Sequence, residues 1–105
     1  MQDSIKVQQL KHRYRNSLAE KAAELDSALA AIEFDHPGAT ATVQQLHEYL
    51  HKLAGSAGMY GYDDIASSAR SSMVLTNARL GVASESAIRQ SINELRHLLE
   101  QQSKS

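Results

Sequence analysis

Residues 43–60 read VQQLHEYLHKLAGSAGMY, and this stretch decides the fold because its apolar residues recur every three or four positions. At about 100° of rotation per residue, they form one stripe along a helix, and His51 lies well off that stripe on the solvent side. Gly55 and Gly58 follow His51, although a glycine inside a helix costs about 1 kcal/mol relative to alanine. The two glycines therefore indicate that something large must come close to this imidazole. The stripe consists of Val43, Leu46, Leu50, Leu53, Ala57 and Tyr60.

The residues around His51 are predicted to shape the site and to dock a partner. We interpret Gly55 as steric clearance rather than close helix packing, because its angle lies far from the apolar stripe. Both interpretations stay open for Gly58, which lies near the helix end, where glycine also serves as a terminator. His47 is interpreted as an exposed polar residue, with a contribution to the charge of the site as the alternative. The residues expected on this face are Gln44, His47, Ala54, Gly55 and Gly58.

The remaining apolar periodicity predicts three further helices. The first is one long helix over residues 3–34, with Asp3 or Ser4 as its N-cap. Its apolar stripe consists of Val7, Leu10, Tyr14, Leu18, Ala22, Leu25, Leu29 and Ile32. The helix that carries His51 is expected to begin at Thr40 or Thr42 and to end near Met59. A third helix follows from Asp63 or Asp64 to Gly81, with an inward face of Ile65, Ala69, Met73 or Ser72, Thr76 and Leu80. Ser84 caps a fourth, whose core positions are Ile88, Ile92, Leu95 and Leu99.

Four amphipathic helices with short turns predict an all-α fold, an antiparallel up-down four-helix bundle formed by a single domain over residues 1–105. The formal net charge of −1 gives no reason to expect nucleic acid or a membrane surface as a partner. The sequence contains no cysteine, which excludes disulfides and thiolate metal sites and is compatible with a reducing cytosol. No apolar run is long enough for a membrane span.

The stretch from His51 to about Leu75 resembles the signature of histidine-containing phosphotransfer (HPt) domains, in which a histidine is followed by a leucine, a glycine and small residues inside a helix. The helical pattern on either side also agrees, so the resemblance covers nearly the whole chain. Many members of the family carry a lysine three residues after the histidine, whereas this chain has Ala54. The nearby Lys52 points about 100° away from His51, so we interpret it as a solvated lysine rather than a phosphate ligand.

The resemblance implies that His51 accepts a phosphoryl group on Nε2 from the aspartyl phosphate of a receiver domain and passes it to another receiver aspartate. The expected partners are receiver domains of response regulators, a hybrid histidine kinase, or both. The receiver would supply the aspartate, the Mg²⁺ and a lysine, so we expect no cofactor in this chain. The sequence contains no nucleotide-binding element, and we therefore expect no autonomous kinase activity. We expect a cytoplasmic monomer.

Two other classes of function use the same residues. His47, Glu48 and His51 fit the H-E-x-x-H pattern of helical zinc hydrolases, in which the glutamate is the general base. The extended form of that pattern requires a glycine and a third histidine at positions that Ala54 and Ala57 occupy here. A non-catalytic helical adaptor, in which the histidine is never modified, is the third possibility.

Overall fold

The structure is a computed structural model that describes residues 2–104, with the side chains of residues 4–104. Within this range the chain is all-helical, as expected, but it contains five helices rather than four. They are α1 (Gln2–Asn16), α2 (Leu18–Ala30), α3 (Ala39–Met59), α4 (Asp63–Thr76) and α5 (Glu85–Lys104).

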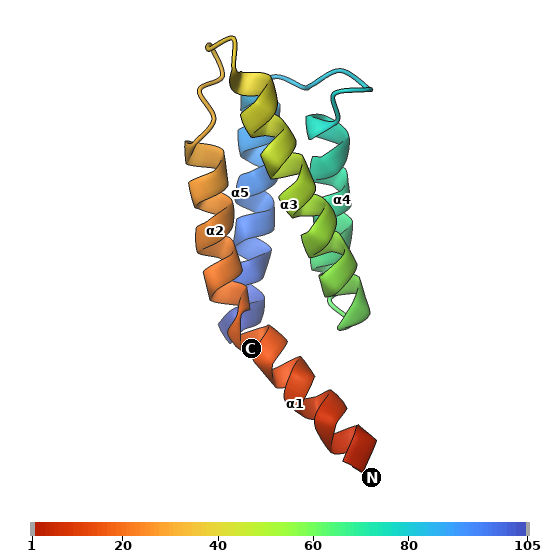
Figure 1. Ribbon diagram of the computed structural model, residues 1–105. Helices are drawn as coiled ribbons and strands as arrows, with labels where there is room; N and C mark the ends of the chain where they lie inside the picture. Colours follow the sequence, from red (N-terminus) through yellow and green to blue (C-terminus); the bar gives the residue numbers. More distant parts are fainter. Residues whose placement is uncertain (1, 105) are drawn as a thin grey trace.

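Helices α2 to α5 form an up-down bundle in which sequential helices are antiparallel (Figure 1). α3 packs against α4, α4 against α5, and α5 back against α2, and α2 also contacts α3. α1 extends from the end of this bundle, close to the C-terminal end of α5 (Figure 1). The predicted up-down arrangement is therefore present, with an additional helix outside it.

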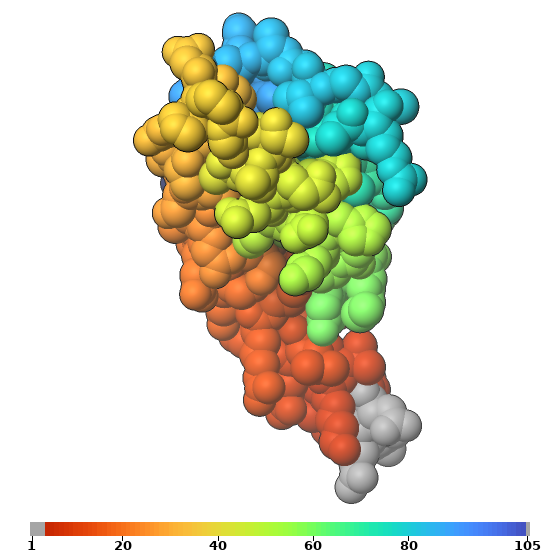
Figure 2. Space-filling view, turned by 45° about the horizontal axis from the view of Figure 1, so that its top comes forward, coloured from red at the N-terminus to blue at the C-terminus, as the bar shows by residue number. Residues whose placement is uncertain are grey.

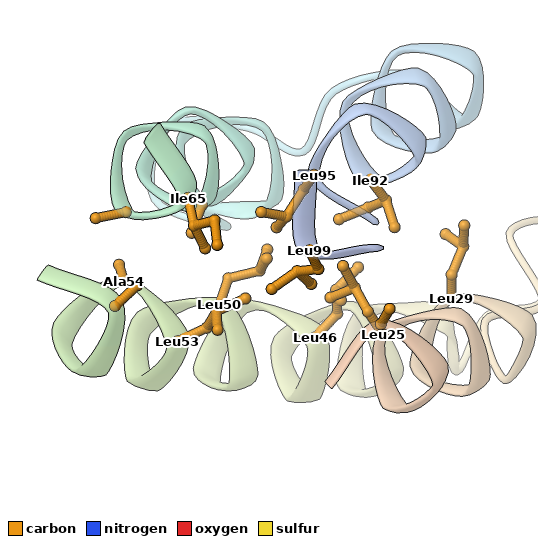
Figure 3. Close-up of a cluster of buried hydrophobic side chains, with 14 of the residues drawn as sticks. Leu25, Leu29, Leu46, Leu50, Leu53, Ala54, Ile65, Ile92, Leu95 and Leu99 are labelled. Atoms are coloured by element: carbon orange, nitrogen blue, oxygen red, sulfur yellow. The ribbon is translucent and has the colours of Figure 1, made fainter. Parts of the chain in front are cut away.

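The core of the bundle is filled by aliphatic side chains from all four helices (Figure 3). Burying a leucine or isoleucine contributes about 1.5–3 kcal/mol relative to leaving it exposed, so this interior supplies the main stabilising free energy. The predicted stripes of α3 and α5 are confirmed, apart from the half-buried Tyr60 just beyond α3. Fully buried large side chains include Leu18, Leu25, Leu46, Leu50, Ile65, Ile88, Ile92, Leu95 and Leu99.

The prediction of one long helix over residues 3–34 was wrong, because α1 ends at Asn16, α2 begins at Leu18 after Ser17, and α2 ends at Ala30. The Ser17 hydroxyl donates to the carbonyl oxygen of Tyr14 at 2.6 Å, and the Ser17 N–H lies 3.1 and 3.0 Å from the carbonyl oxygens of Arg13 and Tyr14. A serine side chain that competes for backbone carbonyls interrupts a helix. The chain therefore bends here, and α1 leaves the bundle (Figure 1).

Because of this bend, the apolar stripe expected over residues 3–34 is buried only from Tyr14 onward. Val7 and Leu10 are 49% and 46% exposed, although the spacing placed them on the same stripe. The predicted N-cap at Ser4 is also wrong, because α1 already includes this residue, and the side chain of Asp3 lies outside the described residues.

The other helix boundaries are partly as predicted. Gly38 precedes α3 without a side-chain cap, so neither Thr40 nor Thr42 caps this helix. α4 begins at Asp63, as expected, but ends at Thr76, and the predicted core residue Leu80 is 68% exposed in the following turn. Ser84 does cap α5, since its Oγ accepts the N–H of Ala87 at 3.2 Å.

Two turns require a left-handed backbone. Gly61 has a φ angle of +84° between α3 and α4, and Gly81 has +87° before α5. Only glycine adopts this region without a steric penalty from Cβ.

At α4, Ser72 rather than Met73 takes the inward position, and its hydroxyl lies 2.5 Å from that of Ser91 on α5. This contact joins α4 to α5.

Candidate functional site

His51 lies on the outer face of α3, and its side chain is exposed, as its position off the apolar stripe predicts. This face forms part of the molecular surface between α2 and α4 (Figure 2, yellow to green). In the described part of the chain, His51 forms no hydrogen bond or ion pair. Its imidazole is therefore open to an approaching molecule.

Gly55 lies one turn beyond His51 and is also exposed. A Cβ atom placed on Gly55 would meet nothing within 4 Å. Close packing against a neighbouring helix therefore does not explain this glycine in the isolated chain. The open space agrees with the interpretation that Gly55 leaves room for a partner beside His51.

Gly58 has a different environment. A Cβ atom there would lie 3.7 Å from a guanidinium nitrogen of Arg70 and 3.9 Å from Cβ of Ala66, both on α4. These are ordinary van der Waals distances, so an alanine fits but a longer side chain would press on α4. Of the two interpretations left open from the sequence, packing between α3 and α4 is the better supported for Gly58.

Ala54 was expected on the exposed face with His51, and this prediction was wrong. Ala54 is only 5% exposed, and its side chain points from α3 into the interior, where Figure 3 shows it facing the helix of Ile65. The apolar face of α3 is wider than the stripe drawn from the sequence, because α4 covers it on the side of Ala54. Ala54 therefore contributes to packing and cannot contact a docked partner.

His47, one turn before His51, is half-buried beside α4. Its Nδ1 lies 3.0 Å from Oγ1 of Thr76, a residue near the end of α4 that is 1% exposed. Sequence reasoning assigned Thr76 to the core and missed this contact. The two residues are 29 positions apart, and only the antiparallel packing of α3 against α4 joins them.

The remaining predicted site residues are on the surface. Gln44 and Lys52 are both exposed. A shallow open depression of about 360 Å³ is lined by His47, Glu48, His51 and Lys52. A larger depression of about 750 Å³ lies at α4 and α5, and none of the predicted site residues lines it. His47 and Lys52 therefore line the same depression as His51. The functional roles of these two residues stay predictions.

The H-E-x-x-H pattern does not form a metal site with other residues. Within residues 4–104, no group of three or more His, Cys, Asp or Glu side chains is placed to hold a metal ion. A catalytic zinc needs three protein ligands. The pattern in this chain offers His47 and His51 without a third ligand, so the zinc hydrolase alternative has no support in the arrangement.

Comparison with protein families identifies the chain. The family model of the Hpt domain matches residues 9–104, which is nearly the whole sequence, so the chain belongs to the Hpt domain family. Hpt domains take part in histidine phosphotransfer in two-component phosphorelays and interact with receiver domains. Searches of curated proteins and of solved structures returned no match. No helix in the described part of the chain is both long and apolar enough to span a membrane.

Proposed function

We propose that His51 is the phosphorylated residue of this Hpt domain and that it relays a phosphoryl group between receiver-domain aspartates. The observation that carries this proposal is the exposed imidazole of His51 beside the empty space at Gly55. A neutral imidazole nitrogen is a good nucleophile near neutral pH. A folded receiver domain needs an unobstructed approach to this ring, and the exposure of His51 and Gly55 on the outer face of α3 supports one; this face is part of the molecular surface in Figure 2.

In the proposed step, the Nε2 lone pair of His51 attacks the phosphorus of an aspartyl phosphate. The N–P bond forms as the bond between phosphorus and the carboxylate oxygen breaks, and the electron pair leaves with the aspartate carboxylate. Such a transfer depends mostly on positioning and on neutralising the phosphoryl charge. We propose that the receiver supplies the aspartate, Mg²⁺ and a lysine, which leaves His51 and a docking face to this chain. The reverse of the same step would phosphorylate a second receiver.

The docking face that we propose comprises the exposed outer residues of α3, namely Gln44, Glu48, His51, Lys52 and Gly55. Ala54 is excluded because it is buried. The natural sources of the phosphoryl group would be response regulators or a hybrid histidine kinase. We further propose that the domain acts as a cytoplasmic monomer and has no kinase activity of its own.

Phosphotransfer profiling tests this proposal. The protein would be incubated with a panel of purified receiver domains that carry labelled aspartyl phosphate, in the presence of Mg²⁺. We expect label on the wild-type chain and none on His51→Gln. His97→Gln is the matched control, because His97 is an exposed histidine on α5. Equal labelling of wild type and His51→Gln would refute the assignment. Receiver binding without any transfer, across the whole panel, would instead indicate an adaptor.

A further inference from the structure

The half-buried histidine next to His51 is held in a defined orientation. Oγ1 of Thr76 donates its one hydrogen within its own helix, where the carbonyl oxygens of Ser72 and Met73 lie at 3.2 and 3.3 Å. The hydroxyl is then an acceptor toward Nδ1 of His47 at 3.0 Å. A neutral histidine carries one ring proton. With the Thr76 hydrogen directed into its own helix, Nδ1 of His47 is the donor of this contact, and Nε2 is the ring nitrogen left for other partners.

The two histidines lie on the same side of α3. Residues four positions apart in a helix have Cβ atoms about 5–6 Å apart. Long side chains in helices also lean toward the N-terminus, over the preceding turn. We therefore expect the ring of His51 to lie toward the turn that holds His47, and both residues line the same depression.

A phosphoryl group on His51 would add about two negative charges to this depression. The other charged side chains that line it are Glu48, which has the same sign, and Lys52. Position 54, on the same helix, is a buried alanine and places no charge beside His51. His47, one turn before His51, is the other side chain of this lining that can carry a positive charge.

We propose that His47 stabilises the phosphorylated form of His51 by donating a hydrogen bond from Nε2 to a phosphoryl oxygen, with Thr76 as the positioning residue. In this phosphorylated state Nε2 carries a proton taken from solvent and donates it in the hydrogen bond to the phosphoryl oxygen. Nδ1 continues to donate to Thr76, so the ring does not need to turn. A hydrogen bond from a charged donor is about twice as strong as a neutral one. This inference rests on the proposed phosphorylation of His51.

The equilibrium of phosphoryl transfer measures this interaction directly, since the hydrogen bond exists only in the phosphorylated state. The full chain and a receiver that labels it would be mixed with Mg²⁺, and the distribution of phosphoryl groups measured. We expect His47→Ala to shift the equilibrium toward the receiver by about tenfold, the loss of one charge-assisted hydrogen bond. His47→Lys should return the equilibrium most of the way to its wild-type value. His97→Ala should leave the equilibrium unchanged.

Thr76→Val tests the positioning role with almost no change in side-chain shape. It should shift the equilibrium less than His47→Ala does. ¹⁵N NMR of the unphosphorylated protein should show the His47 proton on Nδ1 in wild type and a mixture of tautomers in Thr76→Val. A merely structural threonine would leave the tautomer unchanged.

The outcomes separate the two proposals. If wild type accepts no label at His51, the phosphotransfer function fails, and the NMR result still reports on the bond between His47 and Thr76. If His51 is labelled normally and His47→Ala leaves the equilibrium within twofold of wild type, the role of His47 is refuted while the function stands. Failure of His47→Lys to restore the equilibrium, with an unchanged fold by circular dichroism, also contradicts a role based on charge.

Discussion

The hydroxyl groups of Tyr14 and Ser56 lie 2.7 Å apart and join the last turn of α1 to the helix that carries His51. The Tyr14 ring stacks on Tyr60 at a centroid distance of 4.5 Å, and Nζ of Lys21 lies 5.0 Å from the centre of the Tyr14 ring. Burial raises the pKa of Tyr14, while its hydrogen bond with Ser56 acts in the opposite direction. This cluster holds α1 where it leaves the bundle, directly beyond the bend at Ser17.

We predict that Tyr14→Phe lowers the free energy of unfolding by about 0.5–1.5 kcal/mol, because it removes one net hydrogen bond and keeps the ring contacts. Ser56→Ala should have a similar effect. Urea denaturation of both single variants and of the double variant would measure the coupling between them. Strictly additive losses would mean that the hydrogen bond contributes nothing to stability.

The site itself offers a substitution that separates function from stability. Gly55→Leu should slow phosphotransfer at least tenfold, because the added side chain fills the space beside His51 through which the receiver approaches. The same change should leave stability unchanged or raise it by up to about 1 kcal/mol, since glycine is a poor helix former and a Cβ here meets no atom within 4 Å. Transfer rates and urea midpoints would be measured in parallel. A loss of stability comparable to the loss of transfer would indicate a packing role for Gly55.

Gly58 should behave in the opposite way. Gly58→Ala fits at ordinary contact distance from Arg70 and Ala66 and should be tolerated. Gly58→Leu should lower the free energy of unfolding by about 1–3 kcal/mol, because the extra atoms press α3 away from α4. Thermal unfolding of the two variants provides the comparison. If Gly58→Leu is as stable as wild type, α4 moves to accommodate the larger side chain without loss of stability.

Alkaline pH should reveal the contribution of the half-buried Tyr49 to stability. Burial raises its pKa, and the hydrogen bond that it donates to Oε2 of Glu24 at 2.7 Å raises it further. The folded protein therefore holds this proton more tightly than the unfolded chain, in which the pKa is about 10. The contribution of Tyr49 is fully present below about pH 10 and is lost as the pH rises above it.

We accordingly expect the stability advantage of wild type over Tyr49→Phe to shrink between pH 9 and pH 11, in the window set by the ordinary tyrosine pKa of about 10. Urea midpoints of the two proteins across this range give the difference. Ionisable groups that do not interact with Tyr49 affect both proteins equally and cancel in the comparison, whereas the charge of Tyr14 adds to the rise in the pKa of Tyr49 and is part of the measured difference. A difference that is constant with pH would show that Tyr49 ionises alike in the folded and unfolded states.

Much of this architecture follows from periodicity alone. The core positions of α5 and most of those of α3 are set by spacings of three and four, because side chains one turn apart share a helix face. The exposure of His51 and of Gly55 follows from the same rule. The cap at Ser84 was also predictable, since serine is a preferred N-cap residue whose hydroxyl oxygen can accept a backbone N–H of the first helical turn.

Periodicity describes one helix at a time, however, and contacts between helices decided the rest. Val7 continues the stripe of α1 but is exposed, because the bend at Ser17 carries α1 away from the bundle. Ala54 lies outside the drawn stripe but is buried, because α4 covers that side of α3. The bond between His47 and Thr76 joins residues on two antiparallel helices. The sequence alone determined that the chain is all-helical and that His51 faces outward, whereas only the packing of the helices in three dimensions decided where the first helix breaks and which residues surround His51.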